Sequence, residues 1–252
     1  MYVHNPLGRF TDRASDYANY RPGYPQAALM RILKPDPGGI VVADIGAGTG
    51  ISSRLFADLG VDVIAIEPNQ AMVQAAAPHP RVSYRCAQAE ATGLNDSTVE
   101  CVVCAQSFHW FQPEASLLEF HRILRSDGGL ALLWNDRDVE DGFTHSYDQL
   151  VRSVIGDRYP NHEHRRSLDV VADSQLFGPI DYSCYRHRQP LNLDALVGRC
   201  RSSSYIPKTG AAAEALITGL KTLFERWQDS SGRVYFAYQT HLYLTSAQVL
   251  YS

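Results

Sequence analysis

Short apolar runs alternate with amphipathic segments along most of this 252-residue chain. The apolar runs are rich in β-branched residues and are typical of strands buried in a parallel sheet, whereas the segments between them repeat their apolar positions at helical spacing. The expected strands cover residues 40–45, 61–66, 81–86, 99–105, 129–135, 180–188 and 233–245. The expected helices cover residues 25–34, 51–59, 69–77, 113–124, 145–156 and 164–176.

The alternation of strands and helices predicts βαβ units, and therefore an α/β fold with a mostly parallel sheet and helices on both faces. Two further segments, near 193–197 and 212–227, carry an apolar stripe and are interpreted as a helical lid over a substrate pocket. We expect a single domain over residues 1–252. Its parts would be a cofactor-binding core at about 36–136, lid-forming segments at 1–35 and 137–232, and a last strand within 233–252.

The most informative segment is Val41–Gly50, an apolar run that ends in Asp44 and continues with glycines at every second position. Glycine has no Cβ and adopts positive φ readily, so three glycines within this loop predict close approach of the backbone to a ligand. A dinucleotide-binding loop needs G-x-G-x-x-G, but Ile51 stands where its third glycine would be. The pattern D-x-G-x-G-x-G instead resembles motif I of the class I S-adenosylmethionine-dependent methyltransferases.

Polar residues also follow the next two expected strands. Glu67 ends the second strand, and a carboxylate there can accept hydrogen bonds from both ribose hydroxyls, although a solvated acid is the alternative. After the third strand, the Ala89 N–H and Glu90 match the donors and acceptors of an adenine edge. Glu90 could instead cap the helical segment that follows it. Because ligands of open parallel sheets bind beyond the carboxyl ends of the strands, one cofactor can contact all these groups.

Two later segments extend the resemblance. The sequence SFHWF at Ser107–Phe111 follows the fourth strand, and ILRSDGG at Ile123–Gly129 precedes the fifth. This arrangement resembles the methyltransferase type 11 family over roughly residues 15 to 136. The residues at Tyr17–Pro25 and the last expected strand are similar to the trans-aconitate methyltransferase-like branch. The family implies a Rossmann-like, seven-stranded, mostly parallel sheet with an antiparallel last strand.

The resemblance implies S-adenosyl-L-methionine as the cofactor. In the branch, the N-terminal segment folds over the cofactor, so Arg21 could pair with the methionine carboxylate, whereas a plain turn before Pro22 is the alternative. Gln106 would meet the amino-acid end of the cofactor or the edge of its ribose. The expected cofactor-binding residues are Tyr20, Arg21, Asp44, Gly46, Ala47, Gly48, Gly50, Glu67, Pro68, Met72, Ala89, Glu90, Gln106 and Ser107.

His109 and Trp110 are expected to line the substrate pocket. Histidine has an ordinary pKa near 6.5, so His109 could take a proton from a hydroxyl or orient a carboxylate, which makes it the catalytic candidate. Trp110 could form a wall of the pocket or lie against the sulfonium. Alternatively, both are packing residues of the loop.

The overall charge and the apolar runs limit the partners that we expect. A formal net charge of −4 and a pI near 6.1 give no electrostatic footprint for a nucleic-acid backbone. No run reaches the ~18 apolar residues of a membrane span. Residues 1–13 lack the apolar core of a signal peptide, so a cytoplasmic protein with a small-molecule substrate is predicted.

The cysteines and histidines give no indication of a metal site. Cys101 and Cys104 lie three positions apart in an expected strand and therefore point to opposite faces, so the five cysteines are interpreted as buried free thiols. The charged run at His162–Arg166 is expected to face water.

Three functions remain open. The first is a methyltransferase that acts on a small molecule at an O, N or C atom; carboxylate acceptors fit the branch, and Arg21, Arg137 or Arg201 could receive a carboxylate. The second is a non-catalytic regulatory protein that binds S-adenosylmethionine. The third, disfavoured by the glycine spacing, is an NAD-dependent oxidoreductase. The oligomeric state is left open.

Overall fold

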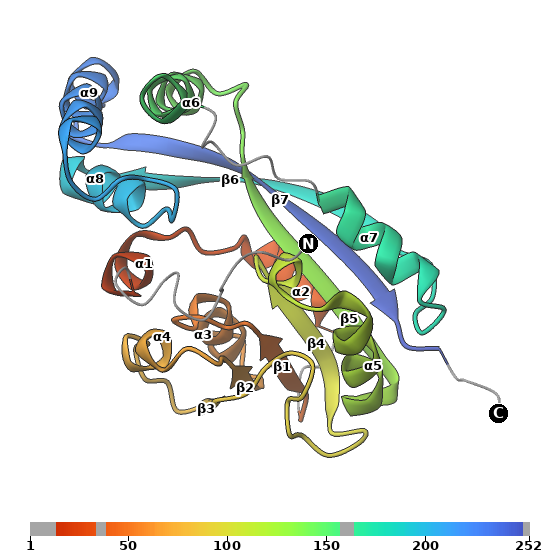
Figure 1. Ribbon diagram of the computed structural model, residues 1–252. Coiled ribbons are helices and arrows are strands. Elements are labelled where there is room, and N and C mark those ends of the chain that lie inside the picture. Colours follow the sequence, from red (N-terminus) through yellow and green to blue (C-terminus); the bar gives the residue numbers. More distant parts are fainter. Residues whose placement is uncertain (1–13, 34–38, 157–163, 249–252) are drawn as a thin grey trace.

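In the computed structural model, seven strands form one sheet with helices on both faces (Figure 1). The structure describes residues 14–33, 39–156 and 164–248. The strands are β1 (Val41–Ile45), β2 (Asp62–Ile66), β3 (Val82–Arg85), β4 (Val99–Ala105), β5 (Leu124–Arg137), β6 (Asp181–Leu191) and β7 (Val234–Ser246). The helices are α1 (Ala14–Tyr20), α2 (Gln26–Ile32), α3 (Ile51–Asp58), α4 (Gln70–Gln74), α5 (Pro113–Ile123), α6 (Gly142–Ile155), α7 (His164–Asp173), α8 (Leu193–Arg201), α9 (Ala211–Trp227) and the short 3-10 helix η2 (Phe108–Trp110).

The strands lie in the order β3-β2-β1-β4-β5-β7-β6. The pairs among β1 to β5 are parallel, whereas β7 is antiparallel to both β5 and β6. The predicted Rossmann-like sheet with an antiparallel last strand is therefore confirmed. Strand order reverses between β1 and β4, and this switch point is where open α/β sheets bind ligands.

The expected elements are present with shifted ends. β5 begins at Leu124 rather than at residue 129, because Val99 of β4 pairs with Leu124 while Cys101 pairs with Gly129, and the extra residues of this irregularity lie in β5. Helix α1 was not expected. The expected helix at 25–34 is observed as α2, and residue 34 lies outside the described residues.

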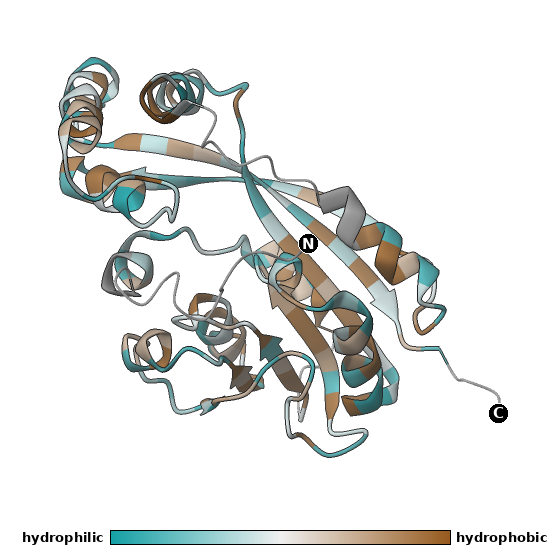
Figure 2. Ribbon diagram, in the orientation of Figure 1, coloured by the Kyte–Doolittle hydropathy of each residue, from teal (hydrophilic) through white to brown (hydrophobic). Residues whose placement is uncertain are grey.

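Successive side chains on the central strands serve two separate cores, as the two-residue strand period requires. Ala43, Val102 and Leu130 pack with α5 and α7, whereas Val42 and Val103 pack with α2 and α3. Figure 2 shows the resulting hydrophobic colouring along β4 and β5. Burial on both faces explains why these segments read as continuous apolar runs.

The cysteine prediction is partly confirmed. Cys101 and Cys104 lie in different cores, on opposite faces of the sheet. All five cysteines are free, and Cys200 is also buried. The interpretation as buried thiols is wrong for Cys86 and Cys184, which are exposed because they belong to the two edges of the sheet, after β3 and within β6.

Helices α6, α8 and α9 pack together around the start of β7, at one end of the molecule in Figure 1. We call this group the helical cluster. β5 and β6 both end beside it, so it lies toward the same end of the sheet as the carboxyl ends of the parallel strands. Helix α1 packs against α8, where a Cβ on Gly198 would overlap the Tyr20 ring. The lid function of these segments stays a prediction.

Among the residues that the structure describes, no helix has the length and apolar character needed to cross a membrane.

Candidate cofactor and substrate site

The loop between β1 and α3 can be built only from glycine at its turning points. Gly46, Gly48 and Gly50 have φ values of 69°, 57° and 72°, in the left-handed region. A Cβ added to Gly46 would come within 2.7 Å of the Ser107 Cβ, and a Cβ on Gly50 would overlap the Tyr84 hydroxyl. Both the backbone conformation and the lack of space therefore account for the predicted close approach.

Asp44 connects the start of this loop to the first turn of α3. Its side chain is fully buried, and Oδ2 accepts hydrogen bonds from the Ser52 Oγ (2.6 Å) and the Ser53 Oγ (2.5 Å) in the first turn of α3. Burial raises the pKa of the Asp44 carboxyl, and the two serine hydrogen bonds oppose this effect only in part. The strand end, the loop and the helix start are thus fixed to one another.

Three buried polar atoms around the loop have no hydrogen-bond partner in the described structure: the Asp44 Oδ1, the Thr49 Oγ1 and the Tyr84 hydroxyl. Buried polar groups in proteins are nearly always hydrogen-bonded, so such a group of orphaned atoms fits a site for a polar ligand. Thr49 and Tyr84 were not predicted as site residues. Tyr84 belongs to the edge strand β3, and it reaches Gly50 only through the tertiary fold.

Glu67 lies at the end of β2, as predicted, and closes the other side of the loop. Its Oε2 accepts a hydrogen bond from the Gly48 N–H and its Oε1 from the Asn69 N–H, both at 2.8 Å. Burial raises the pKa of this carboxyl despite the two backbone hydrogen bonds. Because each carboxylate oxygen has a second lone pair, Glu67 can still accept hydrogen bonds from a ligand. Met72 is buried beside Gly48.

Two further predicted site residues, Pro68 and Ala89, follow the ends of β2 and β3. The Pro68 carbonyl accepts a hydrogen bond from the Cys86 Sγ at 3.5 Å, which ties the end of β2 to the end of β3. Ala89 is buried, and its side chain belongs to the core under α5.

The Glu90 carboxylate contacts the start of α5. Its Oε1 accepts hydrogen bonds from the Gln112 N–H (2.7 Å) and the Ser116 Oγ (3.4 Å). Glu90 therefore acts as a helix cap, although for α5 and not for the segment directly after it, which is not helical. Its contact with adenine stays a prediction.

Gln106 and Ser107 form the tip of β4 and complete the wall beside the loop. Gln106 has a φ of 61°, a conformation that costs a non-glycine residue roughly 1–3 kcal/mol and concentrates at functional sites. Its Nε2 donates to the Asn135 carbonyl at 3.0 Å, while the Ser107 Oγ donates to the Ile45 carbonyl at 2.6 Å. The strained tip is thereby held between β1 and β5.

His109 and Trp110 lie in η2, directly after this tip. His109 is exposed, and its ring centroid is 4.7 Å from that of Trp110. The indole Nε1 of the buried Trp134 is 3.5 Å from the His109 Nδ1. The indole N–H donates to Nδ1 in this long contact, so neutral His109 has its own proton on Nε2 and can donate a hydrogen bond from there.

The segment Tyr20–Tyr24 lies between the glycine loop and the helical cluster. The Arg21 Nη2 donates to the Ser202 carbonyl at 3.1 Å, and the Gly23 carbonyl accepts a hydrogen bond from the Asn135 Nδ2 at 2.9 Å. Burial raises the pKa of Tyr24 well above its ordinary value, and the negative charge of Asp44 adds to this effect. The structure therefore brings the predicted residues Tyr20 and Arg21 to the same edge of the sheet as Asp44.

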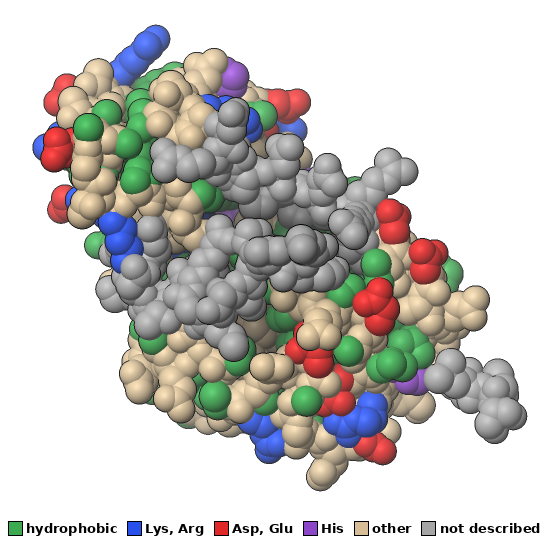
Figure 3. Space-filling model, viewed as in Figure 1, with side chains coloured by type: hydrophobic (Ala, Val, Ile, Leu, Met, Phe, Trp, Pro, Cys, Tyr) green, Lys and Arg blue, Asp and Glu red, His purple; other side chains and the backbone are tan. Residues whose placement is uncertain are grey.

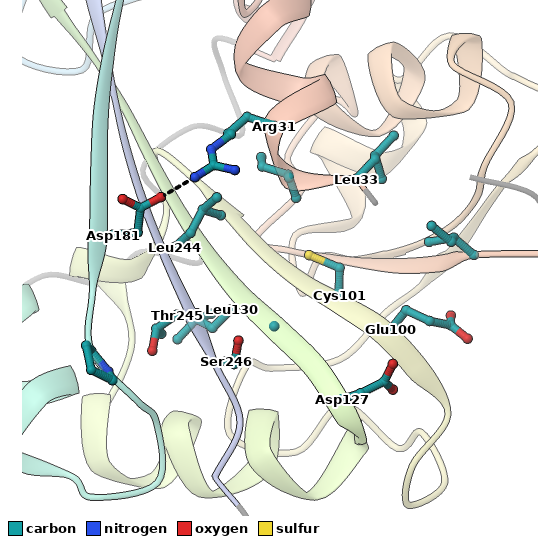
Figure 4. A pocket seen from close by; sticks show the side chains of 14 residues that line it. Arg31, Leu33, Glu100, Cys101, Asp127, Leu130, Asp181, Leu244, Thr245 and Ser246 are labelled. Atoms are coloured by element: carbon teal, nitrogen blue, oxygen red, sulfur yellow. Dashed lines mark hydrogen bonds and ion pairs between the residues drawn. The ribbon is translucent and has the colours of Figure 1, made fainter. Parts of the chain in front are cut away.

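A surface cavity of about 300 Å³ lies elsewhere, at the start of β4 and the end of β7 (Figure 4). An exposed ion pair of 2.7 Å between Arg31 and Asp181 borders it. This is the opposite end of the strands from the glycine loop, so the cavity is separate from the candidate site.

The residues that the structure describes give no sign of a metal site. Among the described residues, no group of three His, Cys, Asp or Glu is placed to hold a metal ion. His162 and Glu163, from the run interpreted as solvent-facing, lie outside the described residues. On the face that Figure 3 shows, basic side chains form small, separate groups.

Comparison with known proteins identifies the family. Residues 43–132 match the sequence model of the methyltransferase domain. An uncharacterised methyltransferase-like protein of Schizosaccharomyces pombe is 35% identical over 211 residues, which cover 80% of this chain and 80% of that protein. An uncharacterised methyltransferase of Mycobacterium tuberculosis is 32% identical over 143 residues, 56% of this chain and 58% of that protein. The alignment thus spans less than two thirds of the mycobacterial relative.

The fold agrees with these sequence matches. The structure of a protein described as a type II methyltransferase from Anaeromyxobacter dehalogenans superimposes with a TM-score of 0.66 at 21% identity, and the match covers 92% of this chain and 100% of that one. This chain therefore belongs to the class I S-adenosylmethionine-dependent methyltransferase family. The cofactor predicted from the glycine loop, S-adenosylmethionine, is confirmed, and the NAD-dependent alternative is set aside. The assignment to the trans-aconitate methyltransferase-like branch stays a prediction.

Proposed function

We propose that this chain transfers a methyl group from S-adenosylmethionine to a small-molecule acceptor. The observation that carries this proposal is the glycine loop, which Asp44 and Glu67 flank and which buried, unpartnered polar atoms surround. When bound, the cofactor would supply an electrophilic methyl carbon: an acceptor atom forms a bond to this carbon from the side opposite the sulfur, the carbon–sulfur bond breaks, and S-adenosylhomocysteine leaves. The chain need then hold the two molecules in a row, and positioning of this kind can lower a barrier by about 7–11 kcal/mol.

The residues around the loop would hold the cofactor. The backbone of Gly46–Gly50 would approach its methionine part, and Glu67 would accept hydrogen bonds from its ribose hydroxyls. Met72 and the Ala89–Glu90 turn would border the adenine ring. Asp44 would act indirectly, because its hydrogen bonds to α3 keep the loop in place.

The acceptor would bind on the side of η2 and the helical cluster. His109 is exposed and can present an Nε2–H to an acceptor oxygen, while Trp110 would line the pocket. The lid would consist of residues 1–35 and 137–232, in a single domain with the core. The net charge of −4 favours a small molecule over a nucleic acid as the acceptor.

A methyl-transfer assay tests the proposal. Labelled S-adenosylmethionine is incubated with the chain and a panel of metabolites, and labelled products are identified by mass. We expect label in at least one small molecule, and none with the Gly46→Ala variant. If S-adenosylhomocysteine binds but no acceptor in a broad panel gains label, the chain is a regulatory protein and the proposal is wrong.

A further inference from the structure

The cavity in Figure 4 lies at the amino-terminal end of the parallel strands and takes no part in the proposed methyl transfer. Its volume of about 300 Å³ is at the lower end of the range of small-molecule sites. Its walls come from segments far apart in the sequence: the end of α2, the starts of β4 and β6, the middle of β5 and the end of β7. The tertiary fold therefore creates this space.

A missing side chain in β5 leaves the cavity open. Gly129 pairs with Cys101 of β4 on one side and with Ser246 of β7 on the other, so these three positions share one face of the sheet. Among the described residues, a Cβ on Gly129 would have one neighbour within 4 Å, the Thr245 carbonyl oxygen at 3.1 Å. The floor of the cavity is thus the bare backbone of Gly129.

Part of the cavity wall is apolar. Leu33, Ile40 and Cys101 are at most 9% exposed and belong to one hydrophobic core, against which Leu244 packs. Burial, and then the charge of Glu100, raise the pKa of Cys101 to about 12. The thiol therefore stays protonated near neutral pH, and this wall can bury the hydrocarbon part of a ligand without reacting with it.

The charged groups that line the cavity are mainly acidic. Three carboxylates, those of Glu100, Asp127 and Asp181, stand against the single guanidinium of Arg31 among the described lining residues. Figure 4 shows Arg31 and Asp181 on one side of the cavity, and Glu100 and Asp127 on the other. The Thr245 hydroxyl, also in the lining, donates its hydrogen to the Gly178 carbonyl at 2.7 Å and so offers only lone pairs. The lining is therefore rich in hydrogen-bond acceptors.

The Glu100 carboxylate is held in a fixed position. Its Oε2 accepts a hydrogen bond from the Val41 N–H at 2.7 Å, and its Oε1 pairs with the Arg125 Nη1 at 2.5 Å. Because each carboxylate oxygen has a second lone pair, Glu100 can accept a further hydrogen bond from a ligand. Its position is set before a ligand arrives.

The ion pair between Arg31 and Asp181 borders the cavity and joins α2 to the start of β6 at 2.7 Å. Both side chains are more than half exposed. Exposed ion pairs contribute little to stability, so this pair can open without unfolding either element. A ligand with a positive charge could take the place of Arg31 beside Asp181.

We propose that this cavity binds a small molecule that combines a hydrocarbon body with an ammonium group. The body would lie over Gly129, against the apolar wall, and the ammonium would donate hydrogen bonds to the carboxylates at the edge. An anion of the same shape would meet three negative charges. The ligand differs from the cofactor and from the methyl acceptor, because the glycine loop lies at the other end of the strands. This inference does not depend on the proposed methyl transfer.

Calorimetric titration of the whole chain tests the inference. The probes are two amines, phenethylamine and hexylamine, with the neutral analogue phenethyl alcohol and the anionic analogue hydrocinnamate. We expect phenethylamine to bind at one site per chain, at least about tenfold more tightly than phenethyl alcohol, and hydrocinnamate not to bind. Saturating S-adenosylhomocysteine should leave the affinity for the amine unchanged.

Two variants locate the bound amine. Cys101→Leu places a larger side chain in the cavity and should abolish binding of both amines. The double variant Asp127→Asn with Asp181→Asn removes two of the three carboxylates and should weaken phenethylamine binding about tenfold, while the affinity for phenethyl alcohol stays unchanged. The matched control is Asp173→Asn with Asp194→Asn, two exposed acids on α7 and α8, which should change neither affinity.

Several results would overturn the inference. It is wrong if neither amine binds, if hydrocinnamate binds as tightly as phenethylamine, or if folded Cys101→Leu binds the amines like the wild type. Competition between the amine and S-adenosylhomocysteine would place the amine at the cofactor site and also overturn it. The wild-type titrations and the exposed double variant decide the question even if Cys101→Leu does not fold. Failure to bind S-adenosylhomocysteine counts only against the methyltransferase proposal.

Discussion

The glycine-loop edge and the helical cluster lie toward the same end of the sheet but are built in different ways. At the glycine loop, several contacts join residues that are close in sequence, such as Asp44 with Ser53 and Glu67 with Asn69, although the Ser107–Ile45 hydrogen bond spans 62 positions. In the helical cluster they join distant ones: the Arg21–Ser202 hydrogen bond spans 181 positions. The first region can therefore be recognised from a short motif, whereas the second exists only once the chain has folded.

The buried charges of the two regions also differ. Among the described residues, only carboxylates, those of Asp44 and Glu67, are buried at the loop, whereas the cluster buries Arg199 and an ion pair of Arg137 with Asp148. Four changes test the glycine-loop side and its neighbour η2.

The largest effect is expected from Gly46→Ala. The new Cβ would lie 2.7 Å from the Ser107 Cβ, which cannot move aside because the Ser107 Oγ is bonded to the Ile45 carbonyl. We expect binding of S-adenosylhomocysteine to be lost in a calorimetric titration. Gly60→Ala is the control: it has a φ of 93° but nothing within 4 Å, so it should cost only about 1 kcal/mol of stability and leave binding intact. Equal binding losses in both variants would point to backbone strain alone.

The next effect concerns His109. In the proposed function, His109 contacts the acceptor and not the cofactor, so His109→Ala should lower turnover about 10- to 100-fold while the affinity for S-adenosylhomocysteine stays constant. Methyl-transfer rates and calorimetry on the same preparation measure the two quantities. Unchanged turnover would remove His109 from the mechanism and leave it as a packing residue of η2.

A comparable or smaller loss is expected from Glu67→Gln. The amide would place a donor against the N–H of Gly48 or Asn69 and would weaken the proposed hydrogen bonds to the ribose, so binding of S-adenosylhomocysteine should weaken about tenfold or more. Asp62→Asn, an exposed acid at the start of the same strand, serves as the control. Equal affinities of Glu67→Gln and the wild type would show that the carboxylate does not bind the cofactor.

The smallest effect is a pH dependence of stability. The pKa of Asp44 is raised from 3.8 in the folded protein, mainly by burial, so the unfolded chain releases this proton first. The contribution of Asp44 to stability is therefore full below pH 3.8 and is lost as the pH rises through the raised folded value. Relative to Asp44→Asn, the wild-type free energy of unfolding should fall over this range, by at most about 1.4 kcal/mol per pH unit. Urea unfolding at several pH values measures it, with the exposed Asp194→Asn as control.

The comparison of the two regions also explains how much the sequence could predict. The strands and the positions of Asp44, Gly46 and Glu67 follow from local patterns, because a buried strand or a glycine turn is encoded by contiguous residues. The antiparallel last strand was expected only from the family resemblance. Tyr84 and Arg199 could not be found in this way. Tyr84 lies on an ordinary edge strand. Arg199 lies on the apolar side of α8, three positions after Leu196, and the sequence does not show that this arginine is buried.

Glu90 shows a different limit of prediction from the sequence. An acid after a strand suits both an adenine contact and a helix cap, and the bond to the Gln112 N–H could not be foreseen because the capped helix starts more than twenty positions later. Local patterns thus identify the residue but not its partner.

The most direct test of the account is a calorimetric titration of the wild-type chain with S-adenosylhomocysteine, and separately with NAD. The account predicts saturable binding of S-adenosylhomocysteine at one site per chain and no heat of binding with NAD. Binding of NAD, or the absence of binding by S-adenosylhomocysteine, would contradict it.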